Sequence, residues 1–211
     1  MKRINLLLMA LVVAMGAQAD DEVLKLSQPD KNRTTLTVMQ AFEQRQSTRE
    51  FSDKALSDND LSDLLWAANG VNRPETGKRT APSAMDRRDV DIYVVMPEAT
   101  YLYDATEHAL KLVAKGDYRS LVAGRQTSVQ AAPVSLVLVS DISKFGGRGD
   151  NDATMGAVDV GIVSQNISLF CSAAKLATVP RGSMEHEKLR EVLQLKEGQK
   201  LILNHPVGYF K

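Results

Sequence analysis

The sequence predicts an α+β domain in which helices flank a central β-sheet. Residues 134–139 read Val-Ser-Leu-Val-Leu-Val, a nearly continuous apolar run that is typical of a central strand covered on both faces. Residues 90–95 form a second strand-like run, rich in β-branched and aromatic side chains. Residues 152–175 carry the longest helical pattern, with small and apolar residues recurring every three or four positions. Together these patterns favour packed layers of sheet and helix.

The first nineteen residues have the order of a Sec-type signal peptide. Lys2 and Arg3 precede an apolar run over residues 6–15, and residues 17–19 read Ala-Gln-Ala, a small-x-small cleavage site. The apolar run is too short to cross a bilayer, which takes about twenty residues. We therefore expect an exported, periplasmic protein without a stable membrane anchor, and an uncleaved N-terminal anchor is the alternative. N-terminal sequencing of protein from fractionated cells would test cleavage after Ala19.

Composition sets limits on the function. Removal of residues 1–19 takes away two basic residues, so 26 basic residues become 24 against 26 acidic ones, and nothing in this balance favours nucleic acid. The remaining chain of roughly 190 residues suits one domain with a sizeable core. The only cysteine, Cys171, falls in an apolar helical run and is expected to be a small buried hydrophobe. The three histidines lie far apart in the sequence, so no metal site is predicted.

Two arginines and a hydroxyl lie close together where the first helical pattern ends. Thr37 begins that helix with the spacing of a capping box, and residues 45–51 then read Arg-Gln-Ser-Thr-Arg-Glu-Phe. Guanidinium groups match phosphate oxygens in bidentate geometry, so Arg45, Ser47 and Arg49 could bind a phosphate monoester. On spacing alone, a solvated charged helix end is the other interpretation.

The Arg-x-Ser-x-Arg-x-Phe pattern after a short helix resembles the phosphate-binding signature of the flavin-dependent nitroreductase family. Three further segments resemble that family in the same order along the chain: Pro-Ser-Ala at residues 82–84, Gly-x-x-x-Gln-Asn-x-x-Leu at 161–169 and Pro-Arg-Gly at 180–182. The resemblance covers residues 36–211 and leaves residues 20–35 as an N-terminal extension. It implies a nitroreductase-like fold with a mixed or antiparallel sheet, assembled as an intertwined homodimer.

The same resemblance implies an FMN site at the subunit interface. Residues 45–49 would bind the phosphate, residues 82–85 would contact the flavin of the opposite subunit, and the backbone amides of Arg181 and Gly182 could donate to the flavin ring. Gln126 would lie near the ring edge, and whether Lys211 reaches the phosphate is left open. No acid or base is assigned, because the flavin carries the reactive chemistry. The implied cofactor-binding residues are Arg45, Gln46, Ser47, Arg49, Pro82, Ser83, Ala84, Met85, Gln126, Pro180, Arg181, Gly182 and Lys211.

The implied activity is that of an FMN-dependent oxidoreductase, which passes hydride from NAD(P)H to an oxidised organic substrate such as a nitroaromatic or a quinone. Within the family the chain is nearest in pattern to the azoline dehydrogenases, which form thiazole and oxazole rings. It departs from that branch at Phe145, where a tyrosine is usual after Lys144, and from the family at Met85, where a small residue is more usual. The alternatives are an azoline-type dehydrogenase, an enzyme with a non-nicotinamide electron partner, and a non-catalytic flavin or small-molecule binder.

Local patterns predict the remaining elements. Ser57 begins a helix that ends at Gly70, and residues 101–104 return as a hairpin partner of the strand before them. Further helices are expected at residues 107–112, 118–129 and 185–193, and a closing strand is expected at 201–209.

Overall fold

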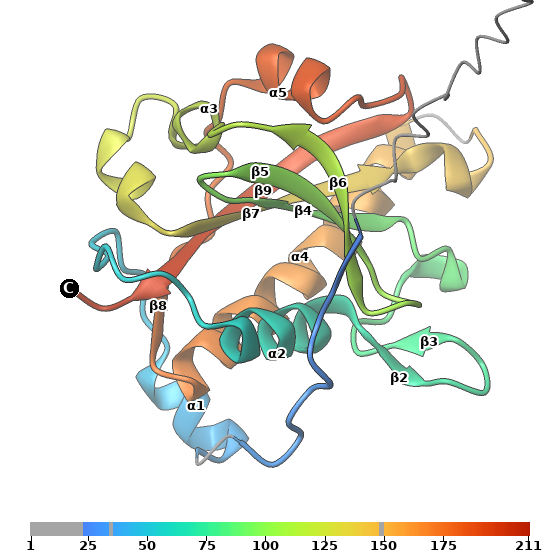
Figure 1. Cartoon of the computed structure of the whole chain (residues 1–211). Helices are drawn as coiled ribbons and strands as arrows, with labels where there is room; N and C mark the ends of the chain where they lie inside the picture. The colour runs from blue at the N-terminus through green and yellow to red at the C-terminus, as the bar shows by residue number, and fades with distance from the viewer. Residues whose placement is uncertain (1–22, 34–35, 148–149) are drawn as a thin grey trace, which may run out of the picture.

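The structure is a computed structural model, and it describes residues 23–33, 36–147 and 150–211 (Figure 1). The predicted signal peptide lies outside these residues. Among the described residues, no helix combines the length and the apolar character needed to cross a membrane. Nor do the same residues bring three or more His, Cys, Asp or Glu side chains together as a metal site would require.

A seven-stranded sheet forms the centre of the domain, and every described strand pair in it is antiparallel. The strand order is β1-β6-β5-β4-β7-β9-β8. Its strands are β1 (Val23–Lys25), β4 (Val90–Val95), β5 (Ala99–Asp104), β6 (Ala109–Lys115), β7 (Val134–Asp141), β8 (Leu176–Thr178) and β9 (Gln199–Tyr209). A separate small hairpin consists of β2 (Val71–Arg73) and β3 (Lys78–Arg79).

Helices cover both faces of this sheet. In Figure 1, α2 and α4 lie below the sheet, and α3 and α5 lie above it. The α-helices are α1 (Val38–Gln44), α2 (Asp58–Asn69), α3 (Arg119–Ala123), α4 (Asp150–Ala173) and α5 (His186–Val192), and the 3-10 turns are η1 (Ala84–Asp86), η2 (Thr127–Ala131) and η3 (Ile142–Phe145).

The predicted central strand is β7, and its two faces contribute to two different cores. Leu136 and Leu138 pack in the larger core with side chains of α2 and α4. Val137 and Val139 point to the other face, where they pack with Leu189 of α5. Side chains alternate across a strand, so an unbroken apolar run is what two buried faces require. The prediction of a strand covered on both faces is confirmed.

Several predicted helix boundaries are also confirmed. The Thr37 hydroxyl accepts from the Gln40 amide while the Gln40 side chain accepts from the Thr37 amide, which is the expected capping box. Ser57 caps α2, which ends before Gly70, and α5 occupies most of residues 185–193. The long helix and the closing strand appear as α4 and β9.

The predicted helix over residues 107–112 is wrong, because most of this segment forms β6. The Asp104 carboxylate accepts from the amides of Thr106 and Glu107, and His108 has a left-handed φ of 47°, which together turn the chain into a hairpin. β6 then pairs with β5 on one side and β1 on the other, so sheet pairing overrides the helix propensity of its Ala, Leu and Lys residues. The helix over 118–129 is only partly right, because Gly124 separates α3 from η2.

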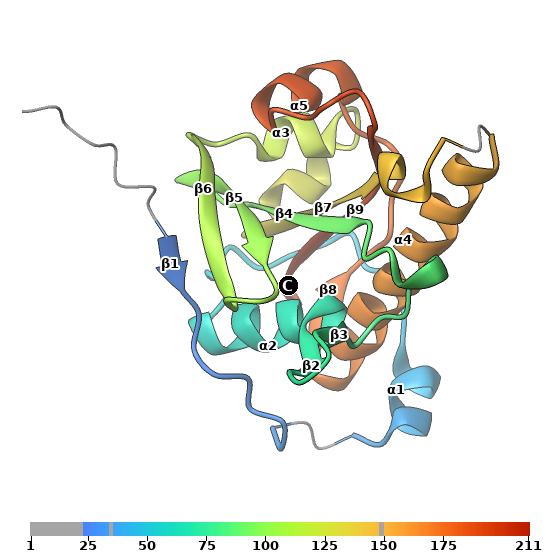
Figure 2. The ribbon, with the colours of Figure 1, turned by 90° about the vertical axis from the view of Figure 1, so that its right-hand side faces the viewer.

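The predicted extension, residues 20–35, contributes the edge strand β1, which lies beside β6 in Figure 2. Beyond β1 the chain crosses to α2, where Arg33 forms ion pairs with Asp60 and Asp63. The extension therefore covers the sheet edge, a surface that would otherwise expose unpaired backbone groups.

The small-residue stripe of α4 divides between two surfaces. Gly156, Val160 and Ser164 are buried against the sheet, and a Cβ on Gly156 would lie 2.3 Å from the Ser140 hydroxyl oxygen. Ala157 and Gly161 are exposed, and a Cβ on Gly161 would meet no atom within 4 Å. One part of the stripe is thus core, and the other faces outward.

Candidate active site

Residues 45–49 run as an extended segment alongside the far edge of the sheet. Arg45 caps the end of α1 and has an extended ψ of 122°, so the chain leaves the helix there. The Thr48 amide donates to the Thr178 carbonyl at 2.9 Å, and the Ser52 amide donates to the Tyr209 carbonyl at 3.0 Å. These two bonds fix the backbone of the segment and leave the side chains of Arg45, Ser47 and Arg49 exposed.

Phe51 anchors the end of this segment. Its side chain is 5 % exposed and packs in a small cluster with Ala123, Val129, Ala132 and Ala177. Close approach is possible because Gly208 lies beside it: a Cβ at that position would lie 2.6 Å from the Pro133 ring. The aromatic residue of the Arg-x-Ser-x-Arg-x-Phe pattern therefore positions the polar residues that precede it.

The polar side chains of the segment are exposed. Arg45, Gln46, Ser47 and Arg49 all face outward, and among the described residues their side chains form no hydrogen bond or ion pair. A cavity of about 550 Å³ opens beside them. Arg45 and Gln46 line this cavity, whereas Ser47 and Arg49 do not. The remaining lining residues come from the end of α1, the end of α4, β8 and the C-terminus: Glu43, Gln44, Ser168, Cys171, Ser172, Lys175, Leu176, Thr178 and Phe210.

Arg181 lies behind this segment and is 5 % exposed. Its guanidinium donates to the Gln126 side-chain oxygen at 2.9 Å and to the Asn204 side-chain oxygen at 2.9 Å. It also donates to the carbonyls of Val122 and Ala123 at 3.1 and 2.8 Å. The structure thus joins Gln126 to Arg181, two predicted site residues separated by 55 positions.

Among the described residues, no acidic side chain forms an ion pair with the arginines of this part of the site. Burial lowers the pKa of Arg181, and the positive charge of Arg49 lowers it further. Within the described part of the chain, neither arginine forms an ion pair with an acidic side chain. Two guanidinium groups that repel each other are stabilised by an anion placed between or beside them.

A buried histidine supports the same region. The Thr178 hydroxyl donates to the Pro206 carbonyl at 2.9 Å, so it accepts from the Nδ1–H of His205 at 3.2 Å. The Nε2 atom of His205 then accepts from the Ser164 hydroxyl at 2.7 Å. Burial lowers the pKa of His205 to about 3, so this ring is neutral and structural. It connects α4 to the β8 residue that fixes Thr48.

The backbone of residues 180–182 differs from the expectation. The Arg181 amide donates to the Asn204 carbonyl at 2.9 Å, and its carbonyl accepts from the Asn204 amide at 2.7 Å. Its N–H is therefore engaged in a β-bridge and is not available to a flavin. Gly182 is exposed, and its N–H has no partner among the described residues, so it is the remaining backbone donor.

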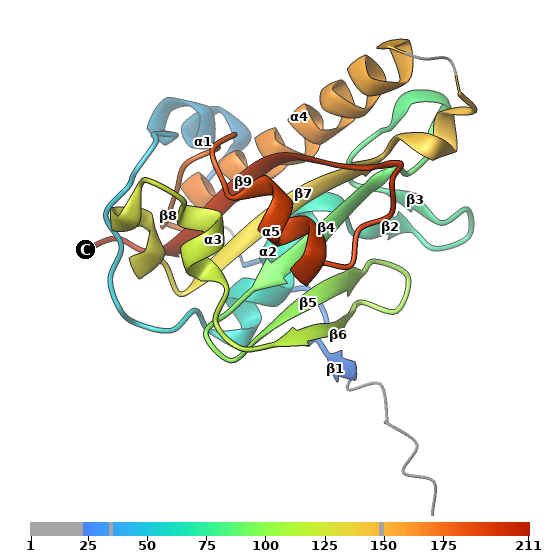
Figure 3. The same cartoon turned by 90° about the horizontal axis from the view of Figure 1, so that it is seen from above.

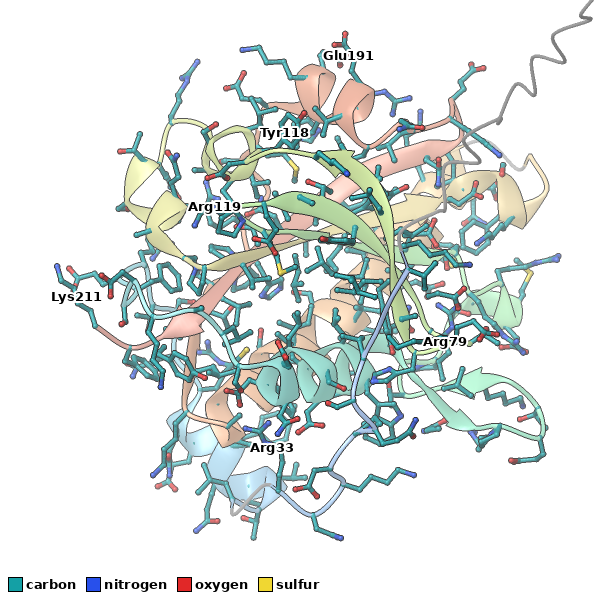
Figure 4. All side chains as sticks on the ribbon, viewed as in Figure 1. Arg33, Arg79, Tyr118, Arg119, Glu191 and Lys211 are labelled. Carbon is teal, nitrogen blue, oxygen red and sulfur yellow. The ribbon has the colours of Figure 1, made fainter. Side chains whose placement is uncertain are left out.

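Lys211 ends the chain on the same side as the 45–49 segment. The bridge between Phe51 and Phe210 places the residue before Lys211 directly beside that segment. Figure 4 shows the Lys211 side chain at this outer edge, whereas Arg79 lies on the opposite side of the domain. Lys211 is exposed, and Lys175 in the cavity lining is a second nearby cation that the motifs did not reveal.

The 82–85 loop lies far from the 45–49 segment of its own chain. The Ala84 amide donates to Asp159 near the middle of α4, whereas the Ser172 hydroxyl near the end of α4 donates to the Ala41 carbonyl of α1. These two α4 residues are thirteen positions apart, which corresponds to about 20 Å along a helix. Figures 1 and 3 place the green η1 turn and the C-terminus at opposite ends of the molecule.

The backbone at residue 85 has a conformation that suits the small residue usual at this position, and Met85 adopts it nonetheless. Met85 and Asp86 both have a φ of 54°, in the left-handed region that favours glycine. The loop is held there because the Arg88 amide donates to the Ser83 hydroxyl oxygen at 2.8 Å. Pro82 and Met85 are exposed, so this end of the domain presents a rigid, partly apolar edge.

A model of the nitroreductase family matches residues 42–209, which is most of the chain. The chain belongs to the nitroreductase family. It is 31% identical over 177 residues to a nitroreductase-family protein of Methanocaldococcus jannaschii, and the match covers 78% of this chain and 86% of the relative.

Solved structures agree with this assignment. A nitroreductase-family protein from Ralstonia eutropha JMP134 superposes with a TM-score of 0.80 at 33% identity, over 90% of each chain. The NADPH:FMN oxidoreductase of Vibrio harveyi, solved with NAD+, shares the fold, with a TM-score of 0.61 at 20% identity over 82% of this chain and 69% of that chain. The α+β, nitroreductase-like fold is thus confirmed, and membership of the family supports an oxidoreductase.

The residues present in this member of the family fit an anionic cofactor. Arg45, Ser47 and Arg49 supply unpaired donors for a phosphate, and Gly182 supplies an unpaired backbone N–H at the neighbouring segment. Supporting residues such as Thr178, His205 and Asn204 escaped the sequence analysis. Each contacts residues that are far away in the sequence, so no local spacing could indicate them.

Proposed function

We propose that this protein is an FMN-dependent oxidoreductase, and the observation that carries the proposal is the uncompensated cation cluster at Arg45, Arg49 and Arg181. The first two arginines are exposed and unpaired among the described residues, and the third has its pKa lowered by burial and by Arg49. A flavin phosphate would supply the missing negative charge. Charge-assisted hydrogen bonds of this kind are among the strongest in proteins.

Bound FMN would supply the redox chemistry, accepting hydride from NAD(P)H and passing it to an oxidised organic substrate such as a nitroaromatic or a quinone. The protein would position it. Residues 45–49 bind the phosphate, Gln126 lies near the ring edge through its bond to Arg181, and the Gly182 N–H donates to the ring. Pro180 fixes the backbone before these donors. The NADPH:FMN oxidoreductase among the structural neighbours favours this donor and cofactor.

The proposed site needs two copies of the chain. The 82–85 loop contacts the middle of α4, and the 45–49 segment follows α1 at the C-terminal end of α4, about 20 Å away along the helix, so a loop from one protomer would contact the FMN bound by its partner. Large apolar side chains are exposed on the elements that would meet: Val38, Met39, Phe42, Met85, Val158 and Phe210. Exposed apolar groups gathered on a few elements are typical of interaction surfaces. A homodimer with FMN at each of two interface sites would bury them.

Spectroscopy under anaerobic conditions tests the function. Purified protein reconstituted with FMN should be yellow, and NADPH or NADH should bleach the flavin absorbance in the blue. Protein that stays colourless after reconstitution would contradict the FMN proposal. A yellow protein that dithionite bleaches, but neither nicotinamide does, would retain FMN and exclude the nicotinamide donor.

A flavin that dithionite bleaches, but NADPH and NADH do not, would favour one of three alternative functions. An exported enzyme meets little free NAD(P)H, so the predicted signal peptide favours a different electron partner if export is verified. An azoline-type dehydrogenase remains the nearest alternative in sequence pattern. A non-catalytic flavin or small-molecule binder would bind FMN but would reduce no added acceptor after bleaching.

A further inference from the structure

A pair of buried carboxyl groups lies beneath the 82–85 loop. Asp89 is fully buried and Asp159 is 2 % exposed. One Asp89 oxygen accepts from the Ser140 hydroxyl at 2.5 Å, while its Oδ1 atom has no hydrogen-bond partner among the described residues. Ser140, which donates to Asp89, also lies against Gly156, one helical turn before Asp159 on α4. Asp159 is near enough for its hydrogen bond and its charge to raise the pKa of Asp89. Two carboxylates cannot share a hydrogen bond unless one of them carries a proton.

We propose that Asp89 and Asp159 share one proton, and that this proton fixes the 82–85 loop in the position that completes the partner's flavin site. The inference rests on the proposed function for its effect on FMN. Neither residue would touch the flavin, so both are positioning residues.

The loop is attached to both members of the pair. Asp159 accepts from the Ala84 amide at 2.8 Å, so it binds the start of η1. Asp89 follows Arg88 directly in the chain, so it holds the other end of the loop covalently. If Asp89 and Asp159 were both ionised, their repulsion would push apart the two residues that hold the loop. Loop residues at 85, 86 and 88 already have left-handed φ values of 54°, 54° and 50°, so this loop is strained and depends on its attachments.

The surroundings favour a shared proton. Burial raises the pKa of Asp89 to about 6, the hydrogen bond and charge of Asp159 also raise it, and the Ser140 hydroxyl opposes them. Ser140 comes from β7 and Asp159 from α4. The other charged residues near the pair are Lys144, which donates to the Arg88 carbonyl, Asp141, whose amide donates to the Asp89 carbonyl, and Asp152 on the buried face of α4.

The sign of the pH effect follows from the raised pKa. A carboxyl group whose pKa rises from 3.8 to about 6 on folding stabilises the folded state most below about pH 4. That contribution is lost as the pH rises through about 6. The loop should therefore be held at pH 5 and loosened at pH 8.

Asparagine substitutions mimic the protonated pair permanently. In Asp89→Asn, the amide nitrogen can donate to Asp159 while the amide oxygen accepts from Ser140. In Asp159→Asn, the nitrogen can donate to Asp89 while the oxygen still accepts from the Ala84 amide. Both variants should bind FMN at pH 8 as the wild type does at pH 5. Asp159→Ala, which lacks donor and acceptor, should hold the loop poorly at every pH.

The experiment measures FMN affinity and Ala84 amide exchange between pH 5 and 8, in the wild type, both asparagine variants and Glu187→Gln. The FMN phosphate itself titrates near pH 6, so the informative quantity is the ratio of wild-type to variant Kd. We expect this ratio to rise about tenfold across the range, because pH 5 lies about one unit below the raised pKa of Asp89. Glu187→Gln removes one exposed carboxylate from α5 and should follow the wild type.

Parallel pH profiles for the wild type and both asparagine variants, with unchanged Ala84 exchange, would overturn the inference. Ala84 exchange is measured without FMN, so it decides the matter even if no variant binds FMN, a result that would contradict the proposed function instead. If one asparagine variant fails to fold, the other gives the same comparison. Carboxyl-carbon NMR of the wild type provides a further check, since an Asp89 carboxyl that titrates at the ordinary pKa of 3.8 would exclude a shared proton.

Discussion

Replacing both Arg45 and Arg49 by alanine is expected to weaken FMN binding by about two to four orders of magnitude. Each charge-assisted bond to phosphate contributes about 1.5–3 kcal/mol, and two such losses correspond to about 3–6 kcal/mol. Folding should be unaffected, because both side chains are exposed and form no hydrogen bond or ion pair with other described residues. Flavin fluorescence titration measures the affinity, and thermal unfolding of the FMN-free protein measures the stability.

The matched control is Lys25→Ala with Lys188→Ala. This double variant also removes two exposed positive charges, and each lysine forms only a surface ion pair of little energetic value. Its FMN affinity should stay within about threefold of wild type, because distant exposed charges are screened by salt. Riboflavin gives a second control, since it lacks the phosphate and should lose little affinity in the arginine variant. Wild-type FMN affinity in the Arg45→Ala, Arg49→Ala protein would rule out the proposed phosphate site.

Replacing Gly161 by leucine should weaken dimerisation and FMN binding together, while the protomer stays folded. A Cβ at Gly161 meets nothing within 4 Å in the single chain, so leucine has room until a second copy approaches. Overpacking a close contact costs about 1–3 kcal/mol. Because the substitution occurs twice in a two-fold symmetric interface, the dimerisation constant should fall by about 30-fold to 10⁴-fold. Sedimentation and FMN titration over the same protein concentrations measure both effects.

Two control variants separate this effect from unfolding. Glu191→Leu places a leucine at an exposed position of α5, on the face of the sheet opposite α4, and should leave both dimer and FMN affinity intact. Gly156→Leu places bulk on the other face of α4, where a Cβ would lie 2.3 Å from the Ser140 hydroxyl, and should destabilise the protomer itself. A Gly161→Leu monomer that binds FMN with wild-type affinity would refute a site shared between subunits.

The sequence determined those features of the fold that depend on nearby residues. The capping box at Thr37, the helix cap at Ser57 and the period of α4 are local, and each appears where the pattern places it. The apolar run of β7 also revealed its two buried faces, because alternation across a strand is a property of the strand alone. The arginines and serine of the 45–49 segment lie within five residues, so their chemistry is visible without any tertiary information.

Tertiary structure decided the features that depend on distant partners. Residues 109–115 became a strand because strands lie on both sides of them, although their composition favours a helix. The stripe on α4 could not be divided into core and outer face until the sheet took its place against Gly156. Arg181 meets Gln126, and Asp89 meets Asp159, only because the sheet and α4 bring together residues 55 and 70 positions apart. Spacing along a chain encodes contacts within a turn or two of a helix or strand, whereas these contacts are set by how whole elements pack.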